Sequence, residues 1–313
     1  NKSFVSHATA KEVREGRGFP RGGIHFRRGD VSWEKYALYC AGLFPKWKYK
    51  SLDMTEVGRR FEETEPLEVG AVVEYFDGGI VVDDSFATGV PGLFAAGECT
   101  LGLFGANRVF SAITEMLVQG ADAGRNAAEY SRQSDAPAPD PESLAEKQRS
   151  AEQPLERKEG LRPAPLRRRV QEMAQRHLGP IRSGEEIEGF LTEIQRVKRE
   201  ELPRLGAAAA GRSYNKEWLD AIELGNIVAL LEIAASSALR RTESRGVHFR
   251  EDHPDTDNDR WLRESVVKRT DAGFELTTRP VSTTSLTPPG GVIPYLDMIK
   301  RMMESHSEIG GHH

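Results

Sequence analysis

The chain has 313 residues, of which 38% are hydrophobic and 29% are charged, so it can bury a core and is expected to form about two domains at about 100–200 residues each. Its 43 Lys and Arg against 48 Asp and Glu give a net charge of −5, which removes a general electrostatic reason to bind nucleic acid. Two cysteines, Cys40 and Cys99, exclude a disulfide framework and a multi-cysteine metal or iron–sulfur site on this chain alone. Because no uninterrupted apolar run approaches the roughly 20 residues of a membrane span, no transmembrane segment is expected.

Residues 1–68 have a mixed pattern. Residues 7–15 predict a short helix, residues 16–23 predict a glycine-punctuated turn, and residues 32–50 are aromatic-rich and partly helical.

Residues 69–131 hold the clearest pattern of the chain. Short apolar runs flanked by glycine or acidic residues predict strands over 69–73, 79–83 and 92–97. Apolar residues at offsets of three and four then predict a helix over roughly 106–130.

Residues 132–163 are rich in Pro, Ala, Ser, Glu and Arg, and we expect a weakly packed linker there. Residues 164–258 indicate three helices in an antiparallel bundle, one of which begins at a capping box with Ser183 as the cap and Glu186 three residues later. The tail, 259–313, is expected to contain a strand pair around 261–268 and 273–279.

The residues that suggest chemistry lie within about 30 residues, in the order that a flavin site requires. The string Gly-Gly-Ile-Val-Val-Asp begins at Gly78, Ala-Ala-Gly-Glu ends at Glu98, and Gly-Ala-Asn-Arg at 105–108 precedes the predicted helix. Glycine lets a ligand approach the main chain, and the unpaired N–H groups of a helix start attract negative charge. A reduced flavin carries such a charge on its pyrimidine edge. Taken alone, each of these strings is more simply explained as part of an ordinary strand–loop–helix crossover.

This string resembles the end of the FAD-binding domain in the succinate dehydrogenase/fumarate reductase flavoprotein family, which also includes L-aspartate oxidase. Residues 243–254, Glu-Ser-Arg-Gly-Val-His-Phe-Arg-Glu-Asp-His-Pro, are similar to the string that closes the family's helical domain, and Glu-Gly-Arg-Gly at 15–18 is weakly similar to its capping domain. The resemblance implies an α/β plus α architecture. Part of an α+β capping domain and the end of a Rossmann-like FAD-binding domain would precede a C-terminal helical bundle.

The resemblance also assigns roles by position. Arg108 would pair with a carboxylate of the substrate, since its planar fork suits bidentate binding. Glu98 would accept a hydrogen bond from the ribityl chain of FAD. The remaining cofactor contacts would come from Gly78 and Gly79 beside the ring, from Asn107, and from the main-chain N–H groups of Ala112 and Ile113. No metal-binding residues are expected.

Three features depart from the family pattern. Glu74 and Phe104 stand where the family usually has histidine, and a carboxylate at position 74 would repel a dicarboxylate substrate. The glycine fingerprint that cradles the pyrophosphate of a dinucleotide is missing near the start. We therefore expect the sequence to be one part of a longer polypeptide, or to be completed by a second subunit.

Outside this string, Arg245, His248 and Arg250 form a basic group with Asp252 nearby. They form either an ion-pair network at a helix end or a contact with the flavin domain or an electron-transfer partner. Cys99, beside Glu98, is expected to be a buried structural thiol.

The resemblance implies an FAD-dependent oxidoreductase that transfers hydride between flavin and a small organic acid. Its partners would be the upstream FAD-binding half and an iron–sulfur subunit. It would lie in the cytoplasm, at the inner face of the membrane through partner subunits. The alternatives are a related flavoenzyme with another substrate, such as an amino acid, and a non-catalytic subunit that completes another chain's flavin site.

Overall fold

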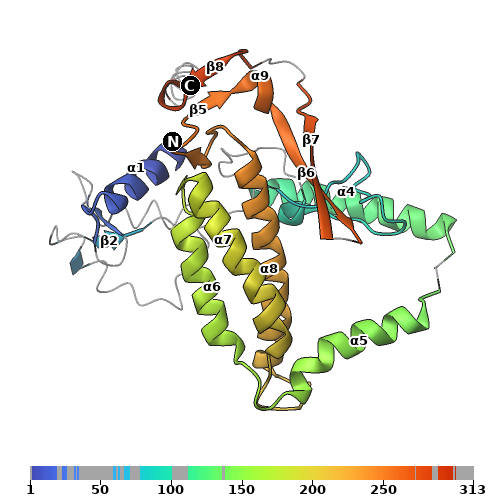
Figure 1. Cartoon of the computed structure of the whole chain (residues 1–313). Coiled ribbons are helices and arrows are strands. Elements are labelled where there is room, and N and C mark those ends of the chain that lie inside the picture. The colour runs from blue at the N-terminus through green and yellow to red at the C-terminus, as the bar shows by residue number, and fades with distance from the viewer. Residues whose placement is uncertain are drawn as a thin grey trace. The chain divides into compact units, whose positions relative to one another are not determined.

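The structure is a computed structural model, which describes residues 2–19, 23–26, 32, 34, 59–60, 63, 67–70, 78–100, 112–135, 138–271, 273–283, 288–298 and 300. The chain divides into two compact units, one of residues Phe4–Glu74 and one of Asn1–Ser3 with Tyr75–His313. The predicted division into five stretches, the first of them residues 1–68, stays a prediction. Figure 1 shows the helices and strands of the chain.

Among the described residues of the smaller unit are a long helix and a two-stranded antiparallel sheet. Helix α1 (Lys2–Arg14) covers the helix predicted over 7–15 and begins five residues earlier. Strands β1 (Ile24–Phe26) and β2 (Leu67–Val69) pair with each other. The aromatic-rich stretch 32–50 lies outside the described residues except for Ser32 and Glu34.

The stretch 78–100 does not form the predicted strands. Single bridges join Ile80 to Thr100 and Ala87 to Phe94, and Gly97–Cys99 forms a short 3₁₀ helix, η2. The strand predictions over 79–83 and 92–97 are therefore wrong for the described residues. A strand needs a neighbour along its length, and an isolated pair of short segments is marginal without a larger sheet.

Helix α4 (Ala112–Gln133) follows this stretch and accounts for the described part of the helix predicted over 106–130. It packs on η2, and its C-terminal end adds an edge-to-face contact between the rings of Tyr130 and Phe94, 5.8 Å apart. We call residues 78–100 together with α4 the flavin module. It is a glycine-rich irregular segment that lies against one long helix.

The stretch expected to be a weakly packed linker contains a helix, α5 (Pro141–Glu156). Asp140 caps it by accepting a hydrogen bond from the N–H of Ser143 at 3.0 Å, and Pro141 stands in the first turn, where proline needs no hydrogen bond. Leu155 is buried, so the expectation of weak packing is wrong at this end.

Three helices form the bundle that the sequence predicts, α6 (Pro163–His177), α7 (Gly184–Arg196) and α8 (Lys216–Arg240). They lie side by side in Figure 1 and pack on one another. The predicted cap is present, because the Ser183 hydroxyl accepts from the N–H of Glu186 at 3.2 Å. A π-helical turn, η4 (Val197–Glu201), and a 3₁₀ turn, η5 (Leu202–Arg204), continue α7.

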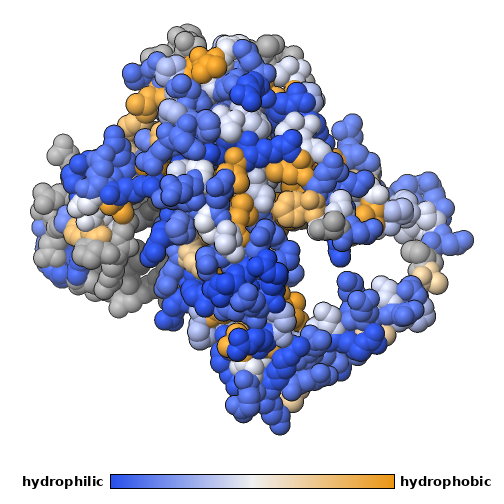
Figure 2. All heavy atoms as spheres, in the orientation of Figure 1, coloured by the Kyte–Doolittle hydropathy of each residue, from blue (hydrophilic) through white to orange (hydrophobic). Residues whose placement is uncertain are grey.

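The core of the molecule lies inside this bundle. One helical face of each helix supplies it, and the fully buried apolar side chains include Val170, Ile187, Phe190, Ile194, Leu224 and Val228. Removing such side chains from water supplies the main driving force for folding. Blue hydrophilic residues dominate the face in Figure 2, and orange hydrophobic residues appear there in separate patches.

Helix α8 is the one described helix that is long and apolar enough, by length and composition, to cross a membrane. Helices α6 and α7 both pack against α8. About one α8 side chain per helical turn is buried. A helix that is apolar on most sides is typical of a bundle core.

Several small β elements lie outside the bundle helices among the described residues. Strands β3 (Ile181–Arg182) and β4 (Phe249–Arg250) pair in parallel, and β5 (Asp255–Asp257) pairs with β8 (Val292–Pro294) in the antiparallel sense. The one-turn helix α9 (Asn258–Trp261) leads into β6 (Arg263–Thr270), which forms an antiparallel ladder with β7 (Gly273–Pro280). The predicted strand pair in the tail is therefore present.

We predict that Gly206→Ala destabilises the bundle strongly. A Cβ at this position would overlap the carbonyl oxygen of Arg157, where the loop after η5 crosses the loop before α6. Because main chain must shift to relieve the clash, the free energy of unfolding should fall by about 3 kcal/mol or more. Urea unfolding followed by circular dichroism measures the change.

Gly189→Ala is the matched control. Gly189 lies in α7 with no atom within 4 Å of the added Cβ, so alanine should stabilise the helix by about 1 kcal/mol. Equal unfolding midpoints for the two variants would contradict the steric argument.

Candidate functional site

The structure describes five of the predicted cofactor-binding positions in full or in part. Gly78, Gly79, Glu98 and Ile113 are described, and for Ala112 only the backbone is. Arg108, Asn107, Glu74 and Phe104 lie outside the described residues.

The two glycines that begin the motif have different surroundings. The Cα of Gly79 lies so close to the main chain of Cys99 that a Cβ would overlap the Cys99 carbonyl oxygen, and the next N–H, of Ile80, donates to that oxygen at 2.8 Å. Gly79 therefore has a structural reason to be glycine. At Gly78 an added Cβ would meet no described atom within 4 Å, so no contact among the described residues covers its main chain.

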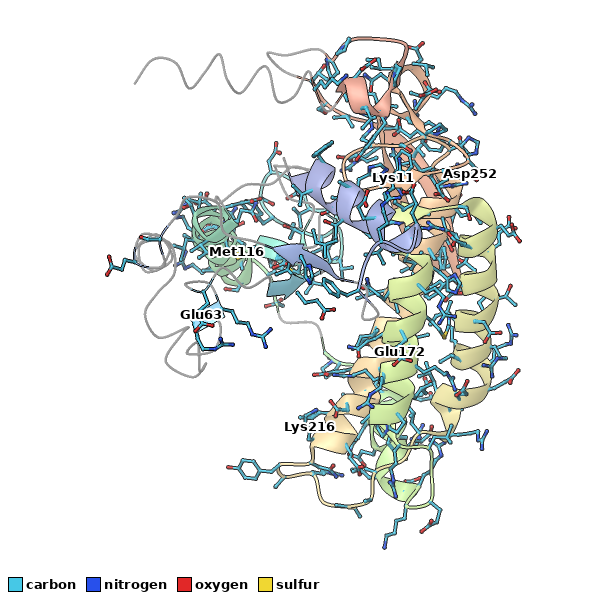
Figure 3. All side chains as sticks on the ribbon, turned by 90° about the vertical axis from the view of Figure 1, so that its left-hand side faces the viewer. Lys11, Glu63, Met116, Glu172, Lys216 and Asp252 are labelled. Atoms are coloured by element: carbon cyan, nitrogen blue, oxygen red, sulfur yellow. The ribbon has the colours of Figure 1, made fainter. Side chains whose placement is uncertain are left out.

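The turn that carries Glu98 is held by a buried amide. The Gln119 side chain on α4 accepts a hydrogen bond from the N–H of Gly97 at 2.8 Å and donates to Glu115 at 2.9 Å. Gly97 has a φ of 81° and is buried, and a Cβ there would lie 3.3 Å from Met116, the α4 residue labelled in Figure 3. The turn is thus locked onto α4, and Glu98 is exposed on it.

Sequence reasoning missed Gln119 and Glu115. Both are buried, at 6% and 7% exposed, and they lie one helical turn apart. The signal available was a pair of polar residues at i and i+4 on a helix that faces a glycine turn. A polar pair of that spacing is common on solvent-exposed faces, so the spacing alone does not show whether the pair is buried or exposed.

Ile113 and Thr114, in the first described turn of α4, are exposed, whereas Glu115 in the same turn is buried. Ile113 is 72% exposed, and the N–H groups of a first helical turn have no partner within the helix. Together with the backbone at Gly78 and the exposed carboxylate of Glu98, this turn fits one wall of a flavin site. The residues that would cradle the pyrophosphate are not among these features.

Cys99, expected to be a buried structural thiol, is exposed. Its Sγ donates to the carbonyl oxygen of Ala96 at 3.2 Å, within the same turn. The expectation is wrong because η2 has no second layer of described residues over it, so the residue that follows Glu98 also faces outward.

The basic group of the second motif is a helix-end network. Arg250, 2% exposed, donates to the carbonyl oxygens of Ala238 and Leu239 in the last turn of α8, at 3.0 and 2.9 Å. Its guanidinium also holds both oxygens of Asp252, at 2.8 and 2.7 Å, and Asp252 accepts from the N–H of Gly184, the first residue of α7. This pair, the helix-end clamp, ties the end of α8 to the start of α7.

The clamp satisfies main-chain groups that a helix end leaves unpaired, and it places a cation at a C-terminus and an anion at an N-terminus. The pKa of Asp252 is held far below its usual value by the hydrogen bonds from Arg250 and Gly184. Figure 3 shows Asp252 at one end of the bundle and Lys216, at the start of α8, at the other.

Glu243 forms the second part of the network. Its side chain is completely buried and pairs with Arg241 and with Arg245, whose Nε lies 2.8 Å from it, and it accepts from the N–H of Asp257 at 2.9 Å. Two cations and a main-chain donor compensate for the burial of one carboxylate. The ion-pair network expected as one of two interpretations is therefore present, and the partner contact stays a prediction.

Two family models match the chain. One, described as the fumarate reductase flavoprotein C-terminus, covers residues 167–292, and the other, an FAD binding domain, covers residues 49–112. The first contains the bundle except for the start of α6, together with the helix-end clamp, and the second contains Gly78, Gly79 and Glu98. The chain belongs to the succinate dehydrogenase/fumarate reductase flavoprotein family.

Among the relatives that match this chain are proteins named as fumarate reductases. One component of the fumarate reductase (CoM/CoB) of Methanothermobacter marburgensis is 31% identical over 269 residues, which are 86% of this chain and 47% of that protein. The fumarate reductase flavoprotein subunit of Mycobacterium tuberculosis is 34% identical over 249 residues, 75% of this chain and 42% of that protein.

A solved structure titled Mycobacterium smegmatis Sdh1 in complex with UQ1 has a chain that superimposes with a TM-score of 0.74 at 31% identity, over 92% of this chain and 48% of that one. This flavoprotein-family chain therefore spans about half the length of the relatives that it matches. The match to an FAD binding domain indicates FAD as the cofactor of this family member.

We predict that His248 makes the bundle less stable in mild acid. Its Nδ1 lies 3.0 Å from Arg182 and its Nε2 lies 3.4 Å from the Arg241 carbonyl oxygen. Burial, and then the positive charge of Arg182, lower its pKa to about 3. In the unfolded chain histidine takes up a proton near pH 6.5.

Between these two pKa values the unfolded state binds the extra proton, so stability falls as the pH falls through this window. His248→Gln should reduce the fall in unfolding free energy between about pH 7 and pH 4.5, where one such group contributes a slope of about 1 kcal/mol per pH unit. Urea midpoints across this range test it, and identical slopes for variant and wild type would remove His248 as the cause.

Proposed function

We propose that the chain is the C-terminal part of an FAD-dependent oxidoreductase that transfers hydride between the flavin and a small organic acid, as in succinate dehydrogenase and fumarate reductase. The observation that carries the proposal is the presence of both family segments in one chain, with the exposed Glu98 turn in the FAD-domain segment. The names of the relatives support the same reaction class. The activity would belong to the complete flavoprotein.

In this proposal the residues of the chain bind and orient, and they supply charge. Bound FAD supplies hydride chemistry at N5 of its ring. Glu98 would accept a hydrogen bond from the ribityl chain, and the main chain at Gly78 and at the start of α4 would contact the ring. Arg108 would hold a carboxylate of the substrate, and Asn107 would contact the cofactor. The buried Gln119 positions Glu98 through the Gly97 hydrogen bond at 2.8 Å.

A second candidate function is a related flavoenzyme with another substrate, such as an amino acid. Glu74 and Phe104 favour it, because neither can act as a neutral or cationic imidazole beside a dicarboxylate. Anaerobic mixing with single candidate acids decides between the two, since only the true substrate bleaches the oxidised flavin spectrum. Complete absence of flavin in the purified complex would support the third possibility, a non-catalytic subunit.

The partners proposed from the family are the upstream FAD-binding half and an iron–sulfur subunit that takes the electrons. A solved neighbour titled Quinol-Fumarate Reductase with Menaquinol Molecules, with a TM-score of 0.78 at 27% identity, supports a quinone-linked assembly. Such an assembly would place the protein in the cytoplasm, at the inner face of the membrane through its partners.

We predict that Glu98→Gln lowers the FAD content of the complete flavoprotein. Glutamine keeps the size of the side chain but accepts a hydrogen bond less strongly than a carboxylate, so affinity for FAD should fall about tenfold. The ratio of flavin to protein in the purified complex measures it. Glu142→Gln, at an exposed glutamate of α5, is the matched control and should keep full occupancy.

We predict that Arg108→Lys weakens substrate binding more than FAD binding. Lysine keeps the charge but loses the planar fork, so KM for the organic acid should rise about tenfold or more while flavin content stays near that of the wild type. Arg125→Lys, at an exposed arginine of α4, controls for the loss of an arginine. Equal losses of flavin and substrate affinity would remove Arg108 from the substrate site.

A further inference from the structure

The turn that carries Glu98 is held on both sides of the preceding residue, Gly97. The N–H of Gly97 donates to the side chain of Gln119 at 2.8 Å. Its carbonyl oxygen accepts two hydrogen bonds from Thr100, one from the hydroxyl at 2.7 Å and one from the N–H at 3.0 Å. A carbonyl oxygen has two lone pairs, so these two bonds use its full capacity.

Thr100 is a buried part of this turn. Its side chain is 1% exposed, whereas Glu98 and Cys99 are exposed. Thr100 also forms a bridge with Ile80, whose N–H donates to the carbonyl oxygen of Cys99 at 2.8 Å. The residue therefore joins η2 to the segment that begins at the glycine pair of the motif.

The hydroxyl of Thr100 adds a bond that the main chain does not require. The bond from its N–H closes η2 in the usual 3₁₀ pattern, from residue i+3 to residue i, and any residue except proline can donate it. The second bond needs a serine or a threonine. Threonine is the stiffer of the two, because branching at Cβ restricts its χ1 angle. The role of the hydroxyl can therefore be tested separately from that of the turn.

The carbonyl that Thr100 holds belongs to the peptide group between Gly97 and Glu98. Gly97 has a φ of 81°, and glycine can adopt many other backbone conformations at little cost. Rotation of this peptide group would redirect the Cα–Cβ bond of Glu98. The hydroxyl bond opposes that rotation, so it restricts the direction in which the Glu98 carboxylate points.

We propose that Thr100 is a positioning residue for the flavin contact of Glu98. Its hydroxyl holds the peptide group before Glu98 and thereby directs the carboxylate to the ribityl chain of FAD. The inference rests on the proposed function and adds to it a residue that acts on FAD only through Glu98. A binding group held by a supporting hydrogen bond loses affinity when that bond is removed.

Thr100→Val tests the hydroxyl by itself, because valine keeps the branched shape of threonine and lacks the donor. FAD is titrated into the complete flavoprotein after its flavin has been removed. The affinity for FAD should fall about fivefold, which corresponds to the net contribution of one hydrogen bond. Thr100→Ser keeps the donor and should restore most of the affinity. Loss of affinity in the serine variant equal to that in the valine variant would overturn the role of the hydroxyl.

Thr256→Val is the matched control. Thr256 lies in β5, is 0% exposed, and donates its hydroxyl to the carbonyl oxygen of Ser244 at 2.6 Å. It therefore loses the same kind of buried bond outside the flavin module, and its affinity for FAD should stay within about twofold of the wild type. Equal losses of FAD affinity in Thr100→Val and Thr256→Val would indicate general destabilisation and overturn the proposal.

A double-mutant cycle tests whether Thr100 acts through Glu98. In a Glu98→Ala background there is no carboxylate to direct, so Thr100→Val should lower the affinity for FAD by less than about twofold. A further fivefold loss in this background would show that Thr100 acts by another route.

Hydrogen exchange gives a measurement of the turn that does not depend on flavin. Thr100→Val should speed exchange of the buried Gly97 N–H about fivefold in the flavin-free protein, and Thr256→Val should leave this rate unchanged. An unchanged rate in Thr100→Val would contradict the hold on the Gly97 peptide group.

Flavin content separates this inference from the proposed function. A purified complete protein that holds no flavin and binds none would refute the oxidoreductase, and the role of Thr100 with it. A protein whose flavin is bleached by an organic acid, and whose Thr100→Val variant binds FAD as tightly as the wild type, would support the oxidoreductase and overturn the role of Thr100.

Discussion

The hydrogen bond between the N–H of Gly97 and the side chain of Gln119 is the constraint on which the flavin side of this molecule depends. It joins an irregular glycine-rich segment to a long helix, and the donor and acceptor are both buried. A buried amide left without its partner is costly, so this bond selects one rotation of α4 over the others. That rotation puts Glu98 on the outside of the turn and leaves Ile113 and Leu117 exposed on the helix.

The bundle is held by a different kind of interaction. Apolar side chains such as Phe190 and Leu224 supply its driving force, while Arg250 and Asp252 determine how two helix ends meet. The carbonyl oxygens at the end of α8 and the N–H at the start of α7 would otherwise need water. The Glu-Ser-Arg-Gly motif thus has a structural role that its charge pattern alone does not reveal. A carboxylate such as Glu243 is acceptable in the interior because arginines surround it.

The two modules therefore differ in completeness. The bundle buries its own apolar residues, whereas the flavin module buries polar ones and exposes Ile113 and Leu117. This contrast agrees with a chain that matches about half the length of its relatives. It also accounts for the strand predictions over 79–83 and 92–97, which are wrong in the described residues. Apolar runs of that kind suit a central strand, and a central strand has no regular form without its neighbours.

The sequence by itself determined what depends on local spacing and local chemistry. These features include the three bundle helices, the Ser183 cap, the strand pair in the tail and the family, because periodicity and short motifs are read within one segment. Tertiary structure alone decided which side of α4 is buried, that Cys99 is exposed, that α5 interrupts the expected linker, and that Gln119 holds the Glu98 turn. Each of these depends on a contact between residues distant in the chain, such as Gly97 and Gln119, and the burial of a side chain is a property of both contacting surfaces.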